Sequence, residues 1–382
     1  MIKKEVFIIG GGLAGLIAAI HLRKLNIAVT LIEKNSYPKH KVCGEYISNE
    51  VLPYLKWLNI LVEELQPTRI NKLQFSTSSG KTINTTLPLG GFGISRYTLD
   101  NYLYQKAIEN GCQVIQETVQ NIVFANNEFK ITTEEGTETR ATIVLGAFGK
   151  RSNIDIQLNR NFIQQKSPWL AVKAHYEGEF PNEVVGLHNF NGGYCGVSKV
   201  EDNKINICYL ASYESFKVFK NNDEYQKQVL ERNPHLKEIF KNIKLSFREH
   251  TRNLKPITIS QISFEVKQPV EQHIIMIGDT AGLIHPLCGN GMAMAIHSAK
   301  IASEVIEDYL YQRIKTRIEM EKVYTKQWNK NFKSRLQTGR GLAIILLKPK
   351  LSDYLFRVVL IAPFLLSIII KKTHGKPISI NN

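Results

Sequence analysis

The chain has 382 residues, of which 43% are hydrophobic and 22% are charged, and its formal net charge is +15. This length suffices for two lobes with large cores, and the ordinary composition excludes a repeat or low-complexity protein. Five scattered cysteines without a CxxC pair argue against disulfides and a zinc site, and no signal peptide precedes the first strand, so we expect a cytoplasmic protein.

The N-terminal segment predicts a strand, a tight turn, a helix and a second strand. The apolar run at residues 6–9 reads as a buried strand, and it leads directly into Gly10-Gly11-Gly12-Leu13-Ala14-Gly15 and a helical pattern. A second strand at residues 28–32 ends in Glu33. A glycine turn in this context is far more specific than GxGxxG alone, and it indicates a dinucleotide site rather than a structural turn.

Each residue of this pattern has a physical role. Gly10 permits the tight turn, Gly12 lets a pyrophosphate approach the backbone, and Gly15 lets the helix pack closely on the strand. The helix N-terminus offers N–H groups to the phosphates, and Glu33 can accept from ribose hydroxyls. A carboxylate here suits a ribose without a 2′-phosphate, so the sequence predicts FAD or NAD rather than NADP.

The next part of the chain mixes short elements. A polar loop carries Cys43-Gly44-Glu45, and three glycines, at 90, 91 and 93, mark an expected turn. Short β runs between residues 113 and 145 predict a meander that leads into the turn at 146–152. The other predicted elements are a helix at about 48–58, strands at 69–77 and 81–87, and a helix that begins at Arg96 and ends at Gly111.

Residues from about 168 to 266 predict a second, β-rich lobe. Its strands should pair antiparallel because their links are too short for helical crossovers. After one or two helices within 213–241, the chain returns to an apolar strand at 273–277, then Gly278-Asp279, a glycine-containing loop and a long helix at 292–310. The four predicted strands of this lobe are 169–176, 184–190, 196–200 and 204–211.

The charge is concentrated in the C-terminal tail. Residues 311–382 hold fifteen Lys and Arg against three acidic residues, so the rest of the chain is nearly neutral. Two apolar runs, 341–347 and 358–370, are shorter than the ~20 residues that span a bilayer. Three interpretations stay open: helices that close a pocket over a long lipophilic substrate, a peripheral surface for anionic membrane at residues 341–376, or a capping bundle. Nucleic acid is not expected, since no reader motif accompanies the charge.

The order and spacing of three glycine-containing turns carry a resemblance to a known family. These are the first turn with Glu33, the strand that enters Gly146, Gly149 and Ser152, and the late strand with Gly278-Asp279 ahead of Pro286 and 289–291. Over roughly residues 4–310 the chain resembles the flavoprotein monooxygenase and reductase superfamily typified by para-hydroxybenzoate hydroxylase, and within it the geranylgeranyl reductase branch.

The resemblance implies a two-lobed α/β (α+β) fold. It comprises a GR2-type Rossmann-like FAD-binding domain (1–70, 95–165 and 270–312), an interleaved antiparallel β-sheet substrate domain (71–94 and 166–269) and a C-terminal helical region (313–382).

The resemblance also implies an FAD site built from all three turns. Arg96 should reach the phosphate or ribityl region, Asp279 should bind a ribityl hydroxyl, and residues 289–292 should present N–H groups to the flavin N1–C2=O edge. No metal is implied. The implied FAD-binding residues are Gly10, Gly12, Leu13, Ala14, Gly15, Glu33, Lys34, Cys43, Gly44, Arg96, Gly149, Gly278, Asp279, Pro286, Gly289, Asn290, Gly291 and Met292.

The resemblance to the reductase branch rests on two segments. Cys43-Gly44-Glu45 resembles a segment near the flavin, and the glycine-tyrosine stretch at 191–194 resembles the substrate-side sheet. Cys43 and Tyr194 are therefore the candidates for the catalytic acid or the pocket wall. The chain departs from the family at 196, 198 and 199, which are usually aromatic or proline, and at Phe148, which is usually Asp. The Trp-x-Trp-x-Ile-Pro signature of halogenases is absent.

The resemblance favours an FAD-dependent reductase of C=C bonds in a lipophilic, isoprenoid-type substrate. Three alternatives remain: a monooxygenase that hydroxylates a hydrophobic aromatic or polyketide-type substrate, a non-catalytic flavin-binding protein at a membrane, and a plain NAD dehydrogenase. Only one dinucleotide fingerprint is present in the sequence, so NAD(P)H should bind transiently or a protein should donate the electrons.

Overall fold

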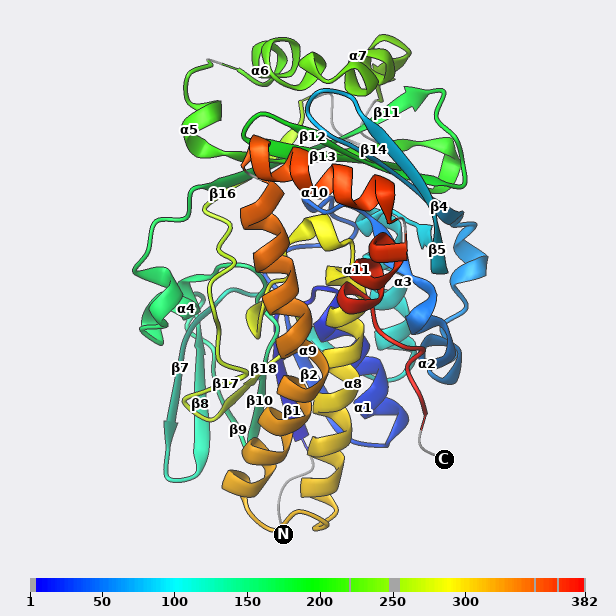
Figure 1. The fold of residues 1–382 in the computed structure, drawn as a ribbon. Helices are drawn as coiled ribbons and strands as arrows, with labels where there is room; N and C mark the ends of the chain where they lie inside the picture. The colour runs from blue at the N-terminus through cyan, green and yellow to red at the C-terminus, as the bar shows by residue number, and fades with distance from the viewer. Residues whose placement is uncertain (1–4, 220, 247–254, 347, 363, 381–382) are drawn as a thin grey trace.

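The computed structural model of the chain describes residues 5–219, 221–246, 255–346, 348–362 and 364–380. The apolar runs expected at 341–347 and 358–370 each include one residue outside this set, 347 and 363. The chain forms two lobes, each built on its own large β-sheet, with long helices running between them (Figure 1). The predicted two-lobed α/β architecture is confirmed, while the domain boundaries given above stay a prediction.

The first lobe is built on a six-stranded sheet with the order β17-β18-β10-β1-β2-β6. Its pairs are parallel except β17 with β18. Because both faces of a parallel sheet are covered, its central strands are continuous apolar runs. The bounds are β1 (Glu5–Ile9), β2 (Ala28–Ile32), β6 (Gln113–Ile115), β10 (Ile143–Gly146), β17 (Val270–Glu271) and β18 (Ile274–Met276).

The sequence suggested a single meander for the β runs between residues 113 and 145, but these runs do not form one sheet. The first and last of them, β6 and β10, enter the parallel sheet, and only the middle three form an antiparallel sheet that packs against β1 and β10. Ile143, Val144 and Leu145 are fully buried, so β10 suits a central strand better than a meander edge. The meander consists of β7 (Val119–Ala125), β8 (Glu128–Thr133) and β9 (Glu138–Ala141).

The second lobe is built on a nine-stranded sheet with the order β15-β11-β14-β13-β12-β4-β5-β3, and β16 also pairs with β11. As predicted, β11 to β14 pair antiparallel, although β12 also pairs parallel with β4. The bounds are β3 (Tyr46–Ser48), β4 (Thr68–Ser76), β5 (Thr82–Gly93), β11 (Trp169–Gly178), β12 (Val184–Phe190), β13 (Gly193–Lys199), β14 (Ile205–Ser212), β15 (Ile243–Leu245) and β16 (Ile257–Ser260).

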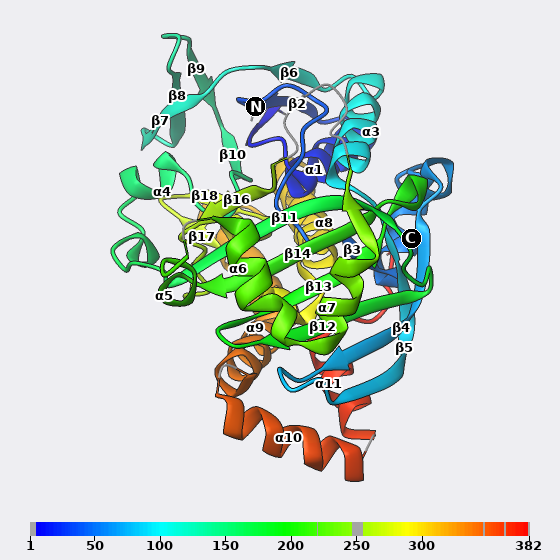
Figure 2. The same cartoon turned by 90° about the horizontal axis from the view of Figure 1, so that it is seen from above.

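Short helices complete both lobes. Three of them, α5 (Tyr213–Phe216), α6 (Asn222–Gln228) and α7 (Pro234–Lys241), cover the outer face of the second sheet (Figures 1 and 2). The first lobe carries α3 (Arg96–Glu109) and α4 (Asn153–Gln157). The helix expected at about 48–58 is present as a 3₁₀ helix over Asn49–Val51 that continues into α2 (Leu52–Trp57). Proline near its first position favours a helix start there, after β3 has ended.

The expectation that glycines 90, 91 and 93 form a turn is wrong. They lie inside β5, where Gly91 and Gly93 are close to neighbouring backbone. A Cβ at Gly91 would lie 2.5 Å from the carbonyl oxygen of Ile47, and one at Gly93 would lie 1.9 Å from that of Lys199. Glycine in a strand can therefore mark a close approach of two backbones rather than a turn.

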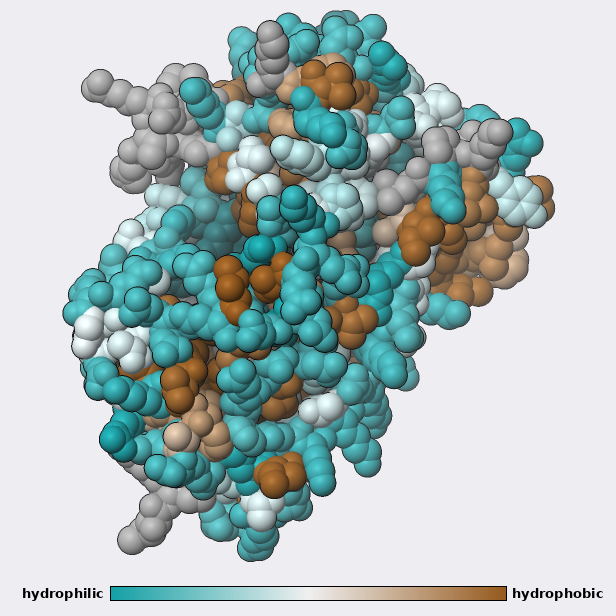
Figure 3. Space-filling model, turned by 90° about the vertical axis from the view of Figure 1, so that its left-hand side faces the viewer, coloured by the Kyte–Doolittle hydropathy of each residue, from teal (hydrophilic) through white to brown (hydrophobic). Residues whose placement is uncertain are grey.

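The C-terminal tail is helical. The helix α9 (Arg317–Leu346) packs along α8 (Gly291–Leu310) and leads to α10 (Pro349–Ile361) and α11 (Phe364–Thr373). Seen from above, α10 lies at the outer edge of the molecule, and hydrophobic side chains gather on that edge (Figures 2 and 3). Within the described parts of the chain, no helix alone is long and apolar enough to cross a membrane. Among these parts, only Tyr354–Ile361 and Phe364–Thr373 taken together have the required length and hydropathy, and the two segments are bent by 111° relative to each other.

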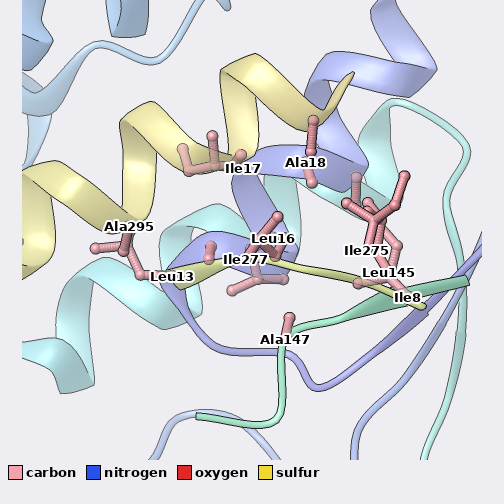
Figure 4. Close-up of a cluster of buried hydrophobic side chains, with 14 of the residues drawn as sticks. Ile8, Leu13, Leu16, Ile17, Ala18, Leu145, Ala147, Ile275, Ile277 and Ala295 are labelled. Atoms are coloured by element: carbon pink, nitrogen blue, oxygen red, sulfur yellow. The ribbon is translucent and has the colours of Figure 1, made fainter. Parts of the chain in front are cut away.

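The core of the first lobe encloses α1 (Leu13–Lys24), whose residues 13 to 22 are all buried. The helix lies between the sheet, through Ile8, Leu145 and Ile275, and α8 (Gly291–Leu310), through Ala295 (Figure 4). A helix that is apolar on all sides is expected when it is enclosed in this way. This packing holds the N-termini of α1 and α8 at the carboxyl ends of the parallel strands.

Candidate functional site

The carboxyl ends of four parallel strands meet at one cavity of about 950 Å³. Gly10 follows β1, Glu33 follows β2, Gly149 follows the end of β10, and Gly278 follows β18. All four residues line the cavity wall. The carboxyl edge of an open parallel sheet is the usual ligand site of such folds.

The three glycines of the first turn have the roles that the sequence predicted for the backbone. Gly10 has φ +107°, and a Cβ there would lie 2.4 Å from the carbonyl oxygen of Ala147. A Cβ at Gly15 would lie 2.1 Å from the carbonyl oxygen of Gly10, so Gly15 packs behind the turn and does not line the cavity. A Cβ at Gly12 would meet nothing nearer than Arg96, at 3.9 Å. The turn therefore opens onto free space at Gly12, beside Leu13 and Ala14.

The N-termini of α1 and α8 both lack a side-chain cap. Gly12 caps α1 without a side chain, and the side chain of Asn290 at the start of α8 does not cap the helix. Neither helix has an acidic residue in its first turn. Two helix ends with uncapped N–H groups in one cavity form an arrangement that could hold an anionic, extended cofactor.

Glu33 is buried against the glycine turn. Its Oε2 accepts a hydrogen bond of 2.7 Å from the N–H of Gly11, and its Oε1 accepts one of 2.9 Å from the N–H of Asn35. Only 8% of Glu33 is exposed, and the neighbouring Lys34 is exposed. The carboxylate therefore shapes the turn in addition to facing the cavity, a second role that the sequence pattern did not show.

Arg96 is held by ion pairs beside the glycine turn. Its Nε and Nη2 each lie 2.7 Å from an oxygen of Asp100, and Asp100 also contacts Lys41 Nζ at 2.9 Å. Burial opposes its charge, but the Asp100 carboxylate outweighs it and raises the pKa of Arg96. A permanently charged group held beside Gly12 fits the predicted contact with a phosphate.

The Cys43-Gly44-Glu45 segment reaches the start of α8. Cys43 Sγ lies 3.4 Å from Met292 Sδ, and the carbonyl oxygen of Gly44 accepts a hydrogen bond of 2.9 Å from Asn206 Nδ2. No neighbouring atom would lie within 4 Å of a Cβ at Gly44. Cys43 is half-buried and, like Gly44, lines the cavity.

Glu45 forms a buried charge cluster that the sequence did not reveal. The carboxylate accepts from Lys173 Nζ, from His175 Nε2 at 2.6 Å and from the N–H of Arg96 at 2.8 Å. Burial alone would raise the pKa of Glu45, but the charges of Lys173 and His175 outweigh burial and hold the pKa at about 2. The cluster joins the Cys43 loop, the first turn of α3 and β11 of the second sheet.

A second set of buried contacts fixes the turns after β10 and β18. The N–H of Gly149 donates to Thr280 Oγ1 at 2.7 Å, and Lys267 Nζ donates to the carbonyl oxygen of Asp279 at 2.9 Å. Burial lowers the pKa of Lys267 to about 8. Asp279 and Gly278 line the cavity, as does Phe148, at the position where the family usually has Asp.

The turn before α8 places Pro286 and Gly289 on the cavity wall, and the start of α8 adds Gly291 and Met292. Gly289 has φ +63°, which favours glycine. Asn290 has a different position, because its Nδ2 donates 2.9 Å to the carbonyl oxygen of Thr373 and its side chain does not line the cavity. Asn290 therefore connects α8 to the tail.

The far part of the cavity is apolar and lies between the second sheet and the tail. Tyr194 of β13 is 8% exposed and packs near the ring of His285, with centroids 5.9 Å apart. Burial raises the pKa of the Tyr194 phenol well above its usual value. The aliphatic and aromatic lining residues of this part are Leu73, Phe75, Ile83, Leu87, Val185, Leu187, Leu342, Leu355, Phe356, Val359, Leu366, Ile369 and Ile370.

The structure thus brings the predicted residues from all three turns to one cavity, apart from Gly15 and the side chain of Asn290. Glycines without neighbours, uncapped helix ends and a fixed guanidinium fit an extended dinucleotide such as FAD. Among the described residues, no group of three or more His, Cys, Asp and Glu side chains is placed to hold a metal ion.

Known proteins provide independent comparisons. Residues 3–309 match the family model described as FAD binding domain. Digeranylgeranylglycerophospholipid reductase 2 of Methanothermobacter thermautotrophicus is 24% identical over 361 residues, which cover 88% of this chain and 86% of the relative.

Two solved structures share the fold. A geranylgeranyl bacteriochlorophyll reductase-like protein of Thermoplasma acidophilum has a TM-score of 0.73 at 19% identity, covering 98% of this chain and 92% of that one. The flavin-dependent brominase Bmp2 has a TM-score of 0.77 at 17% identity, covering 96% and 92%. At these identities the likeness establishes the fold and not the reaction.

Proposed function

The chain belongs to the FAD-binding domain family and is an FAD-dependent oxidoreductase, and we propose that it reduces carbon–carbon double bonds of a lipophilic, isoprenoid-type substrate. The observation that carries this proposal is the shape of the cavity, which continues from the glycine turn at Gly10 to an apolar chamber under α10 and α11. The likeness to a digeranylgeranylglycerophospholipid reductase over most of both chains supports the same substrate class.

The glycine turn and Arg96 would hold the cofactor pyrophosphate, and Glu33 the adenosine ribose. Gly12 leaves room for the phosphates, and the uncapped end of α1 supplies N–H groups. Asp279 would accept from a ribityl hydroxyl, and the uncapped start of α8 would face the N1–C2=O edge, where negative charge develops on reduction. Bound FAD would supply the hydride that the alkene carbon accepts.

The chamber would bind the hydrocarbon chain and exclude water. Its walls come from β4, β5 and β12 on one side and from α10 and α11 on the other, so a long apolar chain would lie between sheet and tail. Burial of such a chain gives roughly 25 cal/mol for each Å² removed from water. The tail would therefore close the pocket, one of the interpretations that the sequence left open.

The second alkene carbon needs a proton, and Cys43 is our candidate for its donor. Its thiol lies on the wall beside the start of α8. Burial raises the pKa of Tyr194 well above its usual value, which makes that phenol a poor proton donor. Tyr194 would then serve as pocket wall.

The electrons would come from NAD(P)H, bound transiently, or from a protein donor. Two reactions remain: reduction of the alkene, and hydroxylation of a hydrophobic aromatic or polyketide-type substrate. Each predicts a different balance of electrons, oxygen and product.

The decisive experiment is a stoichiometry on the purified FAD-bound protein. A geranylgeranyl lipid and an alkylphenol are supplied side by side, with NADPH, NADH or reduced ferredoxin as donor, with and without oxygen. We expect the lipid to gain two hydrogen atoms for every two electrons that the donor supplies, without oxygen consumption. Product that gains one oxygen atom, with equal oxygen uptake, would establish the monooxygenase instead.

A further inference from the structure

The two C-terminal helices are apolar on both sides. On their inner side, Phe356 and Val359 of α10 and Ile370 of α11 line the cavity. On their outer side, Ile361 is 85% exposed and Phe364 is 64% exposed. Both helices therefore present apolar residues on the side that lines the cavity and also on the exposed side.

The exposed apolar residues are concentrated where the two helices meet. The chain bends by 111° between Tyr354–Ile361 and Phe364–Thr373, and this bend is here called the elbow. Leu360 and Ile368 are also exposed, at 52% and 43%, and none of the four outer residues lines the cavity. Figures 2 and 3 show this edge projecting from the body with a group of hydrophobic side chains. An exposed apolar patch of this kind marks an interaction surface.

Positive charges flank the elbow on both sides. Lys348 precedes α10, Arg357 lies on its exposed side, and Lys371 and Lys372 end α11 with exposed side chains. Residues 348–376 hold six Lys and Arg and one acidic residue. Apolar side chains between cations are the composition of a helix that rests on an anionic bilayer.

We propose that the elbow docks the protein on the surface of an anionic phospholipid bilayer. Leu360, Ile361 and Phe364 enter the boundary between headgroups and acyl chains, and Lys371 and Lys372 contact the headgroups. The inner sides of the same helices line the cavity, so a lipid passes from bilayer to cavity without crossing bulk water. The passage of a lipid into the cavity rests on the proposed function, whereas the docking of the elbow does not.

A bilayer fits this surface better than a second copy of the chain. In a two-fold dimer the same patch occurs on both partners, so the cations of one elbow would face those of the other. Like charges placed opposite each other oppose association. An anionic membrane instead meets the apolar residues and the cations with complementary groups.

The test is flotation of the full-length FAD-bound protein with phosphatidylcholine vesicles, with and without phosphatidylglycerol. Two double variants probe the elbow: Ile361→Ser with Phe364→Ser, and Lys371→Gln with Lys372→Gln. The matched control is Ile318→Ser, since Ile318 is 60% exposed near the distant start of α9. Bound FAD and the thermal midpoint establish that each variant is folded.

We expect the wild type to float with anionic vesicles and to be released by high salt, because salt screens the cations. Each double variant should bind these vesicles at least about tenfold more weakly than the wild type, whereas Ile318→Ser should bind as the wild type does. Wild type that stays unbound, or elbow variants that bind as well as it does, would overturn the proposal. Wild type that stays on the vesicles through an alkaline carbonate wash would be inserted across the bilayer, which overturns the proposal. Wild type that does not bind vesicles but forms a dimer, which the apolar double variant loses, would show self-association and would also overturn it.

Discussion

Glu50 Oε2 accepts a hydrogen bond of 2.6 Å from the N–H of Gly375, although the two residues are 325 positions apart in the chain. The same carboxylate lies 3.3 Å from Arg335 Nη1, and the carbonyl oxygen of Glu50 accepts from the N–H of Ile378 at 2.8 Å. Glu50 is fully buried. These contacts tie α9 and the segment after α11 to the first lobe, and they keep Thr373 on the cavity wall.

Replacement of Glu50 by Ala should therefore loosen the end of the tail. Loss of the carboxylate leaves Arg335 without its buried partner, a change that costs roughly 3–5 kcal/mol in general. We expect faster amide hydrogen exchange over residues 364–378 and unchanged exchange in α1, measured by mass spectrometry. Glu109→Ala is the control, because Glu109 is paired with Lys106 on the surface of α3. Equal exchange in both variants would contradict a role for Glu50 in holding the tail.

Alanine at Gly12 should weaken FAD binding without lowering stability, whereas alanine at Gly15 should lower the stability of the fold. At Gly12 the new methyl enters free space at an ordinary φ of −81°, so the apoprotein should keep its stability. The same methyl occupies the space expected for the pyrophosphate, so the dissociation constant of FAD should rise at least about tenfold. At Gly15 the methyl meets the carbonyl oxygen of Gly10, and overpacking of this kind costs about 1–3 kcal/mol.

Flavin fluorescence titration and thermal unfolding of the apoprotein separate the two outcomes. Gly341→Ala controls for loss of a glycine, since no neighbouring atom outside its own helix would lie within 4 Å of its Cβ, its φ is not positive and it does not line the cavity. If Gly12→Ala binds FAD as the wild type does, the pyrophosphate does not lie at this turn.

The sequence predicted the parts of the site that local contacts determine. The turn at Gly10 and its partner Glu33 lie within one strand-turn-helix-strand unit, so their spacing alone indicates their proximity. Glu45 is different, because its partners Lys173 and His175 lie 128 and 130 positions away and meet it only when the second sheet forms. The strand around Gly91 was missed for the same reason, since only the neighbouring strands show that glycine is needed there.

The tail shows a second limit of sequence interpretation. The apolar runs of 341–347 and 358–370 were compatible with a pocket lid and with a membrane surface, because periodicity shows that a helix has apolar faces without showing what covers them. The structure places Phe356 and Ile370 on the cavity and Ile361 on the outside. The inner side fits a pocket wall, and the outer side is the surface that we propose to dock on a membrane.

Glu45 should make stability depend on pH in the acid range. Its folded-state pKa of about 2 lies below the usual value of 4.5, so the folded protein binds fewer protons than the unfolded chain. The stabilisation is present above pH 4.5 and is lost as the pH falls toward 2. Glu45→Gln leaves the buried Lys173 without its partner, so it should lower the stability at pH 7 by about 3 kcal/mol.

The difference between wild type and Glu45→Gln should therefore shrink as the pH falls from 4.5 toward 2, as measured by thermal midpoints. Glu183→Gln is the matched control, since Glu183 pairs with Lys72 at 3.0 Å on the surface, where solvent screens the pair and its contribution to stability is small. Parallel curves for wild type and Glu45→Gln would mean that the cluster adds no stability.

Cys43 and Tyr194 can be distinguished as proton donors by conservative substitutions. Cys43→Ser keeps the size of the side chain but replaces a thiol with a much weaker acid. If Cys43 donates the proton, product formation from a geranylgeranyl lipid should slow by about a hundredfold or more. Tyr194→Phe removes only a hydroxyl whose pKa burial has raised far above working pH, so the rate should change by no more than a few-fold.

The half-reactions must be measured separately, because a displaced flavin would also slow turnover. Flavin reduction by the electron donor and FAD content should be unchanged in Cys43→Ser, and only product formation should be slow. Cys112→Ser controls for loss of a thiol, since Cys112 is buried and does not line the cavity. Slow product formation in Tyr194→Phe but not in Cys43→Ser would assign the proton to Tyr194. Normal rates in both variants would mean that water delivers it, and the apolar chamber would then have to admit solvent during the reaction.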